Sequence, residues 1–465
     1  MGAHHHPRGG IQRRGPGSHR QPGPARARRR LHEGWGPFLR RRIITVASGK
    51  GGVGKTTFAI NFALALSRVA PTILVDLDTG TSSVRSTLDV EVGKDLYHFF
   101  RRGASLRECL THLDLKMDPH GQYKNFSFVA APRHVIEEIS SMSENARWRL
   151  MAAINELPAT FIVLDLRAGL DDHVIDFLPL SNSGILIFTP QHPAATLAAA
   201  DIVRSLLFRK LRVVFSEHSP LFDSADGKRQ HRLVNELLDQ VEDVYVEQLP
   251  NLDAFLLDLE QALGDNQYVN PIRKVIHGFG VYFVLNMFNG IEQSWETAVR
   301  PFISQLHQGV STRLNITNLG WIVQDTEIHK ANCRRRPILL DQGEKQLERQ
   351  GNAVMDELER LEASLIGLPA AADFQPERGP EAHDSLANLG GVDPFTAQLE
   401  VLNRMYTSRG ATRVRDNFAY ITHRVLHLVR DLPAEVFGQP RLLPPSAMVH
   451  HVFRKESSPG RPGRV

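Results

Sequence analysis

The chain has 465 residues, 42% hydrophobic and 23% charged, which suits one large domain with appended segments. No apolar run approaches the roughly 20 residues of a membrane-spanning helix, and no secretory signal opens the chain, so we expect a cytoplasmic protein. The net charge of +4 argues only weakly for nucleic-acid binding, because residues 1–42 hold eleven arginines and one glutamate and the rest carries about −6.

The N-terminal residues 1–41 form a segment rich in Arg, Pro and Gly with almost no apolar side chains. Such a segment cannot bury enough surface to offset its ordering entropy, so we predict a disordered arm. It is either an electrostatic arm for anionic lipid or nucleic acid, a solvated tail or misplaced translation start, or a transit peptide. The sequence leaves these alternatives open.

From Arg42 onward, short apolar runs alternate with stretches of helical length. Near-continuous apolar strands between helices indicate an α/β fold, here a mainly parallel sheet with helices on both faces. The carboxyl ends of such strands form the ligand-binding edge. Strands are predicted over 43–48, 72–78, 126–131, 161–166, 184–190, 281–288 and 314–322, and helices over 55–68, 144–157, 194–210 and 291–307.

The later part of the chain departs from this alternation. Residues 216–277 show helical periodicity and predict a helical insertion, either a partner surface or packing against the domain. The main domain is expected over 42–366, ending in a charged helix at 342–366, and is followed by a Pro- and Gly-rich linker at 367–391. Beyond it, 392–453 predicts a helical appendage, and 454–465 a disordered tail.

Two amphipathic helices are predicted within the appendage, over 393–406 and 414–432. In the second helix, one face gathers the apolar residues Phe418, Ile421, Val425, Leu428, Val429 and Leu432. Arg and His on the opposite face would suit a membrane surface. Docking on a partner or on the body is the favoured alternative.

A phosphate-binding motif lies where the first predicted strand meets a helix. The run GKGGVGKT, from Gly49 to Thr56, fits G-x-x-x-x-G-K-[ST] in the context that this motif requires. Backbone N–H groups of a glycine-rich turn and the positive end of a helix bind phosphates. Lys55 should therefore reach the β- and γ-phosphates, and the Thr56 hydroxyl should bind Mg²⁺. The motif makes the expected sheet that of a P-loop NTPase, and its predicted nucleotide-binding residues are Gly49, Gly51, Gly52, Val53, Gly54, Lys55, Thr56 and Thr57.

Three carboxylates end neighbouring predicted strands. Asp165 suits a Mg²⁺ ligand acting through water, Asp78 suits a residue that orients the attacking water, and Asp76 is a further candidate for the metal. A single aspartate at a strand end is often only a turn or N-cap residue. Three at one edge of a sheet favour a catalytic site.

The motifs together resemble the MinD/ParA family of ATPases, which carries a deviant Walker A loop. The resemblance rests on KGGVGKTT, the DxD at 76–78, IVLDLRAG ending in Asp165 and Gly169, FVLNMF with Asn286, and the segment GWIVQDTEIHKANCRRRPILL. It covers roughly 42–340. Within the family, VLDLRAGLDDHVIDF looks most like the flagellar-number regulators FlhG and FleN.

The resemblance implies that Lys50 is a catalytic lysine acting on the nucleotide of a partner subunit, while Lys55 acts within its own subunit. It further implies ATP and Mg²⁺ as cofactors, an ATP-dependent homodimer, slow hydrolysis stimulated by a protein partner, and attachment to a membrane surface or to non-specific DNA. It adds Gly169 and Asn286 to the nucleotide-binding residues, with Asn286 near the base. The output would be the positioning or number of a cellular structure such as a division site, flagellum or DNA cargo.

Four residues depart from the family pattern: Ser83, Arg167, Val323 and Gln324. They bear on turnover and on base contacts, and they leave open a nucleotide-binding scaffold with little hydrolysis. A metabolic P-loop enzyme is a second alternative. The two cysteines, Cys109 and Cys333, stand in no CxxC motif, which argues against an iron–sulfur cluster. The sequence does not choose the structure that is positioned or the attachment surface.

Overall fold

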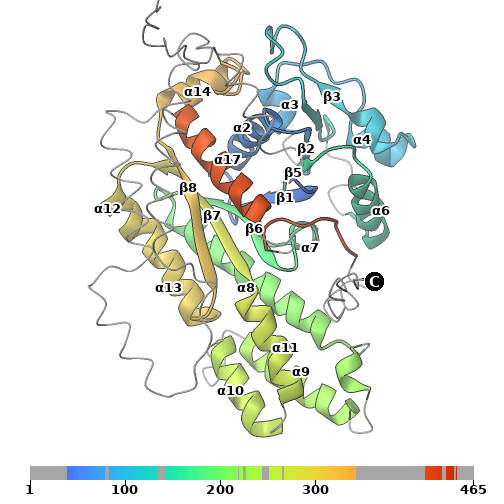
Figure 1. The fold of residues 1–465 in the computed structure, drawn as a ribbon, viewed down its shortest axis with the longest axis vertical. Coiled ribbons are helices and arrows are strands. Elements are labelled where there is room, and N and C mark those ends of the chain that lie inside the picture. Colours follow the sequence, from blue (N-terminus) through green and yellow to red (C-terminus); the bar gives the residue numbers. More distant parts are fainter. Residues whose placement is uncertain are drawn as a thin grey trace, which may run out of the picture. The chain divides into compact units, whose positions relative to one another are not determined.

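The computed structural model describes residues 39–78, 83–134, 142–217, 219–223, 227–242, 251–263, 266–341, 414–431, 436–444 and 447. Its centre is a sheet with the strand order β3-β4-β2-β5-β1-β6-β7-β8 (Figure 1). All neighbouring strands are parallel except β3 and β4. The strands are β1 Arg42–Ala47, β2 Thr72–Asp76, β3 Thr111–His112, β4 Phe126–Val129, β5 Phe161–Asp165, β6 Asn182–Phe188, β7 Gly280–Phe288 and β8 Asn315–Val323.

Helices connect and cover these strands. They are α2 Lys55–Ser67, α3 Ser83–Thr87, α4 Leu96–Arg101, η1 Leu106–Cys109, α6 Glu144–Asn155, α7 Asp172–Ile175, α8 Pro193–Val214, η2 Pro220–Phe222, α9 Gly227–Glu242, α10 Leu252–Leu263, α11 Asn266–His277, α12 Ile291–Ser294, η3 Trp295–Val299, α13 Arg300–Gly309, α14 Thr326–Cys333 and α17 Val414–Asp431. Helices α2 and α17 pack together, and so do α8 and α13. Right-handed crossovers on either side of β1 place these two pairs on opposite faces.

The predicted fold class is confirmed, because the predicted strands occur in order in a mainly parallel sheet. Their sequences are apolar because both faces are covered: Ile43, Ile44 and Val46 of β1 are all fully buried. Strand β3 was missed, since two residues give no periodic signal. Strand β2 ends at Asp76, two residues before the predicted end, which frees Asp78 from the sheet.

The predicted helix over 291–307 is interrupted. Helix α12 is followed by η3, a π-helical turn, and α13 begins at Arg300 with Pro301 in its first turn. Proline has no N–H to donate, so it cannot continue an α-helical ladder, and the wider turn precedes it.

The described residues of the segment 216–277 are mainly helical, as predicted, with η2, α9, α10 and α11. Its first long helix, α9, is fastened to α8 at its carboxyl end, where Arg204 donates to the carbonyl oxygens of Val241 (3.1 Å) and Glu242 (2.9 Å). Helix α11 also contacts α8. The described part of the insertion therefore packs against the domain.

The predicted helix over 414–432 is found as α17, and its apolar face lies against the body. Phe418, Ile421, Val425 and Val429 are buried, together with Leu426, which the predicted face did not include. Leu428 is only half-buried. A face buried in this way is not available to a membrane surface, so that alternative is not supported for α17. None of the described helices is long and apolar enough to span a membrane.

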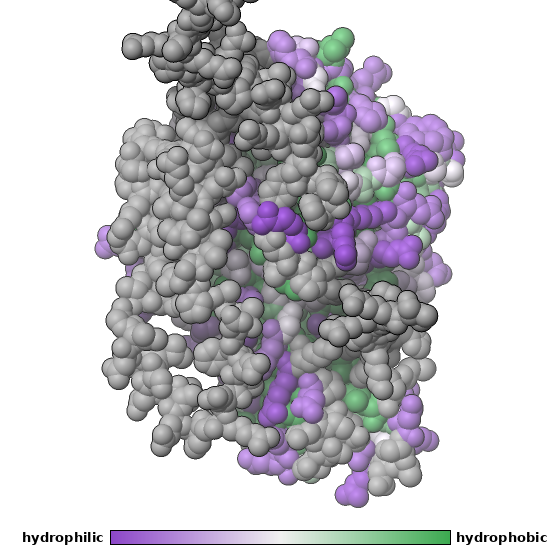
Figure 2. All heavy atoms as spheres, viewed as in Figure 1, coloured by the Kyte–Doolittle hydropathy of each residue, from purple (hydrophilic) through white to green (hydrophobic). Residues whose placement is uncertain are grey.

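Several predicted segments lie outside the described residues: the arm up to residue 38, the helices over 342–366 and 393–406, the linker at 367–391 and the tail at 454–465. The domain boundaries stay predictions. In the view of Figure 2 the described surface is mainly hydrophilic, with hydrophobic residues scattered between. The large hydrophobic residues that are exposed among the described ones are Leu115, Leu170, Leu197 and Leu257.

Candidate functional site

The loop between β1 and α2 has the backbone of a phosphate cradle. Gly52 and Gly54 have φ angles of 81° and 84°, a region that side chains other than glycine rarely adopt. A Cβ on Gly54 would lie 2.2 Å from Nδ2 of Asn286, and one on Gly49 would lie 2.4 Å from the backbone of Ala198 in α8. The loop can therefore close only because these positions are glycines.

Asn286, near the end of β7, fixes this loop. Its Nδ2 donates to the carbonyl oxygen of Val53 at 2.8 Å, and the side chain is buried. The next residue, Met287, has a φ of 55°, an uncommon angle for a residue other than glycine. The sequence grouped Asn286 with the nucleotide-binding residues, and the structure brings it against the loop.

Lys55, the first residue of α2, is buried beside two of the predicted carboxylates. Its Nζ lies 2.6 Å from Oδ1 of Asp165 and 3.8 Å from Oδ2 of Asp78. Strand register explains the meeting, because Asp165 pairs with Val46 of β1 on one side and with Asp76 of β2 on the other. One ammonium group thus faces several carboxylates at the carboxyl edge of the sheet.

Asp76 is fully buried at this edge, and it organises the chain that follows β2. Its two oxygens accept from the backbone N–H groups of Asp78 (3.1 Å) and Val84 (3.3 Å). Burial, together with the negative charge of Asp165 and against the opposing charge of Lys55, raises the pKa of Asp76 to about 8. Asp76 is therefore mainly protonated at pH 7, and the surplus of carboxylates over the single ammonium group comes from Asp165 and Asp78.

These residues fit a Mg²⁺-bound triphosphate. Oδ2 of Asp165 is buried and has no hydrogen-bond partner among the described residues, so its lone pairs are available to a metal-bound water. Lys55 uses one of its three N–H donors on Asp165 and keeps others for phosphate oxygens. Surplus carboxylate charge suits a divalent cation, and the cradle of positive-φ glycines suits the phosphates. Thr56 and Thr57 lie half-buried in the first turn of α2.

The second lysine of the loop has a different environment. Lys50 is exposed, while Lys55 is 6% exposed. Around Lys50, the Ser48 hydroxyl donates to the Lys50 carbonyl oxygen at 3.0 Å, and the Gly169 N–H donates to the Ser48 carbonyl oxygen at 3.0 Å. Gly169, predicted from the resemblance, is thus held against the loop.

Three polar residues that the sequence did not single out bond to the first turn of α2 or to the end of β8. Asn332 of α14 donates to the Thr57 hydroxyl at 3.4 Å. Gln191, after β6, donates to the side-chain oxygen of Gln324 at 2.7 Å. Asn417 of α17 accepts from the Val323 N–H at 3.0 Å. Asn332 lies within the family-like segment 320–340, and that position was the only feature of the sequence that pointed to the site.

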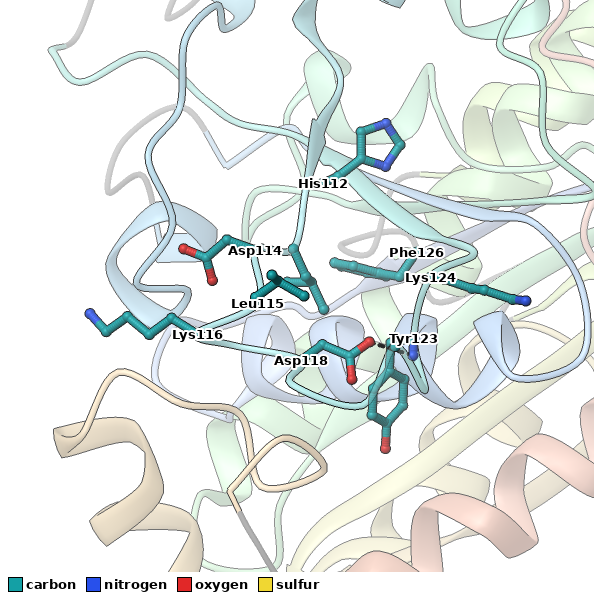
Figure 3. Close-up of a pocket in the computed structure, with 10 residues that line it drawn as sticks. His112, Asp114, Leu115, Lys116, Asp118, Tyr123, Lys124 and Phe126 are labelled. Atoms are coloured by element: carbon teal, nitrogen blue, oxygen red, sulfur yellow. Dashed lines mark hydrogen bonds between the residues drawn. The ribbon is translucent and has the colours of Figure 1, made fainter.

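A separate hollow of about 680 Å³ lies beside β3 and β4 (Figure 3). Phe126, Tyr123 and Leu115 line it, with Lys116 and Lys124 also present. The aspartates there are engaged in turns: Asp118 accepts from the N–H groups of Gln122 and Tyr123, and Asp114 accepts from that of Met117. No residue of the phosphate-binding loop lines this hollow, so the candidate site is the loop and its carboxylates.

Comparison with known proteins agrees with this geometry. The model of the CobQ/CobB/MinD/ParA nucleotide binding domain matches residues 44–363, more than half of the chain. The chain belongs to this family. The MinD/ParA resemblance of the motifs is therefore confirmed at the family level, while the flagellar-number branch stays a prediction.

Individual relatives are more distant. A putative septum site-determining protein MinD from Chlorella vulgaris is 27% identical over 167 residues, which are 36% of this chain and 56% of that protein. MinD from Thermotoga maritima is 26% identical over 189 residues, 38% of this chain and 65% of that protein. The chain thus spans somewhat over half the length of these curated relatives.

Among solved structures, the Pyrococcus furiosus cell division ATPase MinD aligns with a TM-score of 0.39 and 16% identity, covering 69% of this chain and 99% of that one. The MinC:MinD cell division protein complex of Aquifex aeolicus aligns with a TM-score of 0.38 and 15% identity, covering 73% and 100%.

Proposed function

We propose that this protein is an ATP-binding and ATP-hydrolysing dimerisation switch that regulates the position or number of a cellular structure. Family membership supports nucleotide binding. One observation carries the switch: two lysines of one loop have opposite environments. Lys55 is buried against Asp165 and Asp78, whereas Lys50 is exposed at the loop's outer side.

Each residue of the site has a role in this proposal. Lys55 and the loop N–H groups bind the phosphates, while Thr56 and, through water, Asp165 hold Mg²⁺. ATP with its magnesium ion supplies the phosphoanhydride that is cleaved. Asp78 is partly exposed and near Lys55, so it orients the attacking water, while Asp76 holds the backbone that carries Asp78. Coordination of Mg²⁺ by Asp76 stays a prediction.

The exposed side of the loop is the proposed dimer surface. Leu170 follows Gly169, and Leu197 precedes Ala198, the residue against which Gly49 packs, so two exposed leucines flank the loop. Burial of exposed apolar area favours association, and Lys50 would gain the charge of the γ-phosphate bound by the second copy. Loss of that phosphate removes the attraction, which makes the dimer depend on ATP.

The partners are also proposed. A relative is known in a MinC:MinD complex, which supports a protein partner that binds or activates the dimer here. A membrane surface or non-specific DNA is the proposed attachment surface. Binding to DNA through basic residues would weaken steeply with salt, whereas docking on a protein partner would weaken less.

The test is solution mass by light scattering with Mg²⁺ and either ATP or ADP. We expect Asp78→Ala to trap a dimer with ATP but not with ADP, and Lys50→Ala in the same background to remain monomeric. Lys124→Ala, an exposed lysine beside the separate hollow, is the matched control and should still dimerise. An unchanged mass with bound ATP would refute the switch, and ATP-dependent dimers without any hydrolysis in the unmutated protein would favour a scaffold.

A further inference from the structure

Helix α17 is built into the domain behind the phosphate-binding loop. Phe418 stacks on Phe58 of α2 with ring centroids 5.9 Å apart, and Phe58 stacks in turn on Phe62 at 5.3 Å. Gly320 of β8 allows the close approach of α17, because a Cβ there would lie 2.8 Å from Ile421. The helix therefore contacts both the helix that carries Lys55 and the last strand of the sheet.

The contact with β8 includes one partly buried hydrogen bond. The N–H of Val323 donates to Oδ1 of Asn417 at 3.0 Å, and Asn417 is 1% exposed. The neighbouring Gln324 N–H donates to Phe288 of β7, so the Val323 N–H faces the opposite, outer edge of β8. Since β8 is the last strand in the sheet order, no strand of the described sheet meets that donor. Asn417 satisfies it.

Val323 begins a short path back to the phosphate-binding loop. Gln324 accepts from Gln191, and Asp325 caps α14 by accepting from the Glu327 N–H at 2.8 Å. At the other end of α14, Asn332 donates to Thr57, next to Thr56. A shift at the end of β8 would therefore move α14 and its contact with the first turn of α2.

We propose that Asn417 is a positioning residue of the nucleotide site, which holds the end of β8 and thereby α14 against the phosphate-binding helix. This rests on the nucleotide binding in the proposed function, but not on hydrolysis or dimerisation. Asn417 acts on the site through the hydrogen bond that it accepts from the Val323 N–H. The C-terminal helix is then part of the nucleotide-binding unit rather than a separate module.

The experiment compares ATP affinity, by calorimetry, with the melting temperature of the full chain. Asn417→Ala should raise the Kd for ATP about fivefold, since a lost hydrogen bond costs about 1 kcal/mol. Val429→Ala, also buried on α17 but far from Val323 along the helix, is the control. It should lower the melting temperature and leave the Kd unchanged.

Two further measurements test the route through Val323. Val323→Pro removes the N–H donor, so Asn417→Ala should have much less effect on the Kd in that background than alone. Hydrogen exchange of the Val323 amide should be faster in Asn417→Ala, which decides the route if the proline variant does not fold.

Three results would overturn the proposal. The first is a lower melting temperature of Asn417→Ala with an unchanged Kd for ATP. The second is a change of Kd on Asn417→Ala that is as large in the Val323→Pro background as alone, and the third is an unchanged exchange rate of the Val323 amide in Asn417→Ala. If the unmutated protein binds no nucleotide, the proposed function fails and this inference fails with it. If the unmutated protein binds ATP but Asn417→Ala, like the control Val429→Ala, lowers only the melting temperature, this inference fails and the proposed function stands.

Discussion

Lys55 and Lys210 are both buried lysines, but they lie in opposite surroundings. Lys55 is 6% exposed at the strand ends, between Asp165 and Asp78. Lys210 is 9% exposed on α8, with its Nζ 5.9 Å from the ring centroid of Phe279, and it has no ion pair among the described residues. Burial lowers the pKa of Lys210 to about 8.

The different surroundings of the two lysines distinguish a binding site from a buried charge that lowers the stability of the fold. A buried ammonium group with surplus carboxylates around it has charge to share with a ligand, as at Lys55. A buried ammonium group in apolar surroundings only loses its hydration, as at Lys210. Burial alone therefore does not identify a functional lysine; the charged partners do.

The largest effect is expected from Lys55→Met. The variant loses at least two charge-assisted hydrogen bonds to phosphate, so ATP affinity should fall on the order of a thousandfold, about 4 kcal/mol. Calorimetric titration with Mg²⁺ and ATP measures this. Lys50→Ala should keep the ATP affinity of the monomer. A Kd of Lys55→Met within tenfold of that of the unmutated protein would show that Lys55 is not a main phosphate-binding residue.

Lys210→Met should act in the opposite direction and stabilise the protein. The pKa of about 8, against an ordinary 10.5, corresponds to a cost of about 3 kcal/mol at pH 7. Between pH 8 and 10.5 the unfolded chain holds a proton that the folded chain has lost, so the stability of the unmutated protein rises with pH there. The advantage of the variant should shrink across that window.

Urea unfolding at pH 7, 9 and 10.5 checks this, with Lys228→Met as the control, because Lys228 is exposed on α9. ATP affinity should not change in either variant. A destabilised Lys210→Met, or an advantage that is independent of pH, would show that Lys210 is not a buried unpaired charge.

His423 on α17 extends the comparison to a buried basic group that stays neutral near pH 7. Burial, together with the neighbouring His427 and Arg430, lowers the pKa of His423 to about 4. As pH falls from 6.5, the unfolded chain binds a proton that the folded chain does not, so stability is lost, by about 2 kcal/mol at pH 5. In His423→Leu this loss should be absent.

Unfolding curves at pH 7 and pH 5 measure that difference, and His112→Leu on the exposed edge strand β3 is the control. If His423→Leu loses as much stability as the unmutated protein on acidification, another group carries the acid sensitivity.

The sequence predicted the Lys55 region and not the other two, for a physical reason. The loop from Gly49 to Thr56 and the strand ends at Asp78 and Asp165 are local patterns whose chemistry depends on residue type and spacing. Strand order then follows from alternation and crossover handedness. These signals lie within one or two elements of each other.

The rest depends on partners that are distant in sequence. The contact between Asn417 and Val323 joins residues 94 positions apart, and that between Asn332 and Thr57 joins residues 275 apart. The periodicity of α17 predicted an apolar face but not what covers it, so a membrane surface stayed possible beside the favoured docking on a partner or on the body. The pKa of Asp76 likewise depends on burial by several strands at once.

The smallest effect is expected where charges meet at the surface. Arg212 of α8 pairs with Asp239 and Glu242 of α9, and all three side chains are at least one-third exposed. Water screens such pairs, so Arg212→Ala should cost no more than about 1 kcal/mol in unfolding free energy, and less at 1 M salt. A loss of unfolding free energy well above about 1 kcal/mol would mean that the insertion depends on these pairs. We expect instead that the hydrogen bonds from the Arg204 guanidinium to the carbonyl oxygens at the end of α9 hold it.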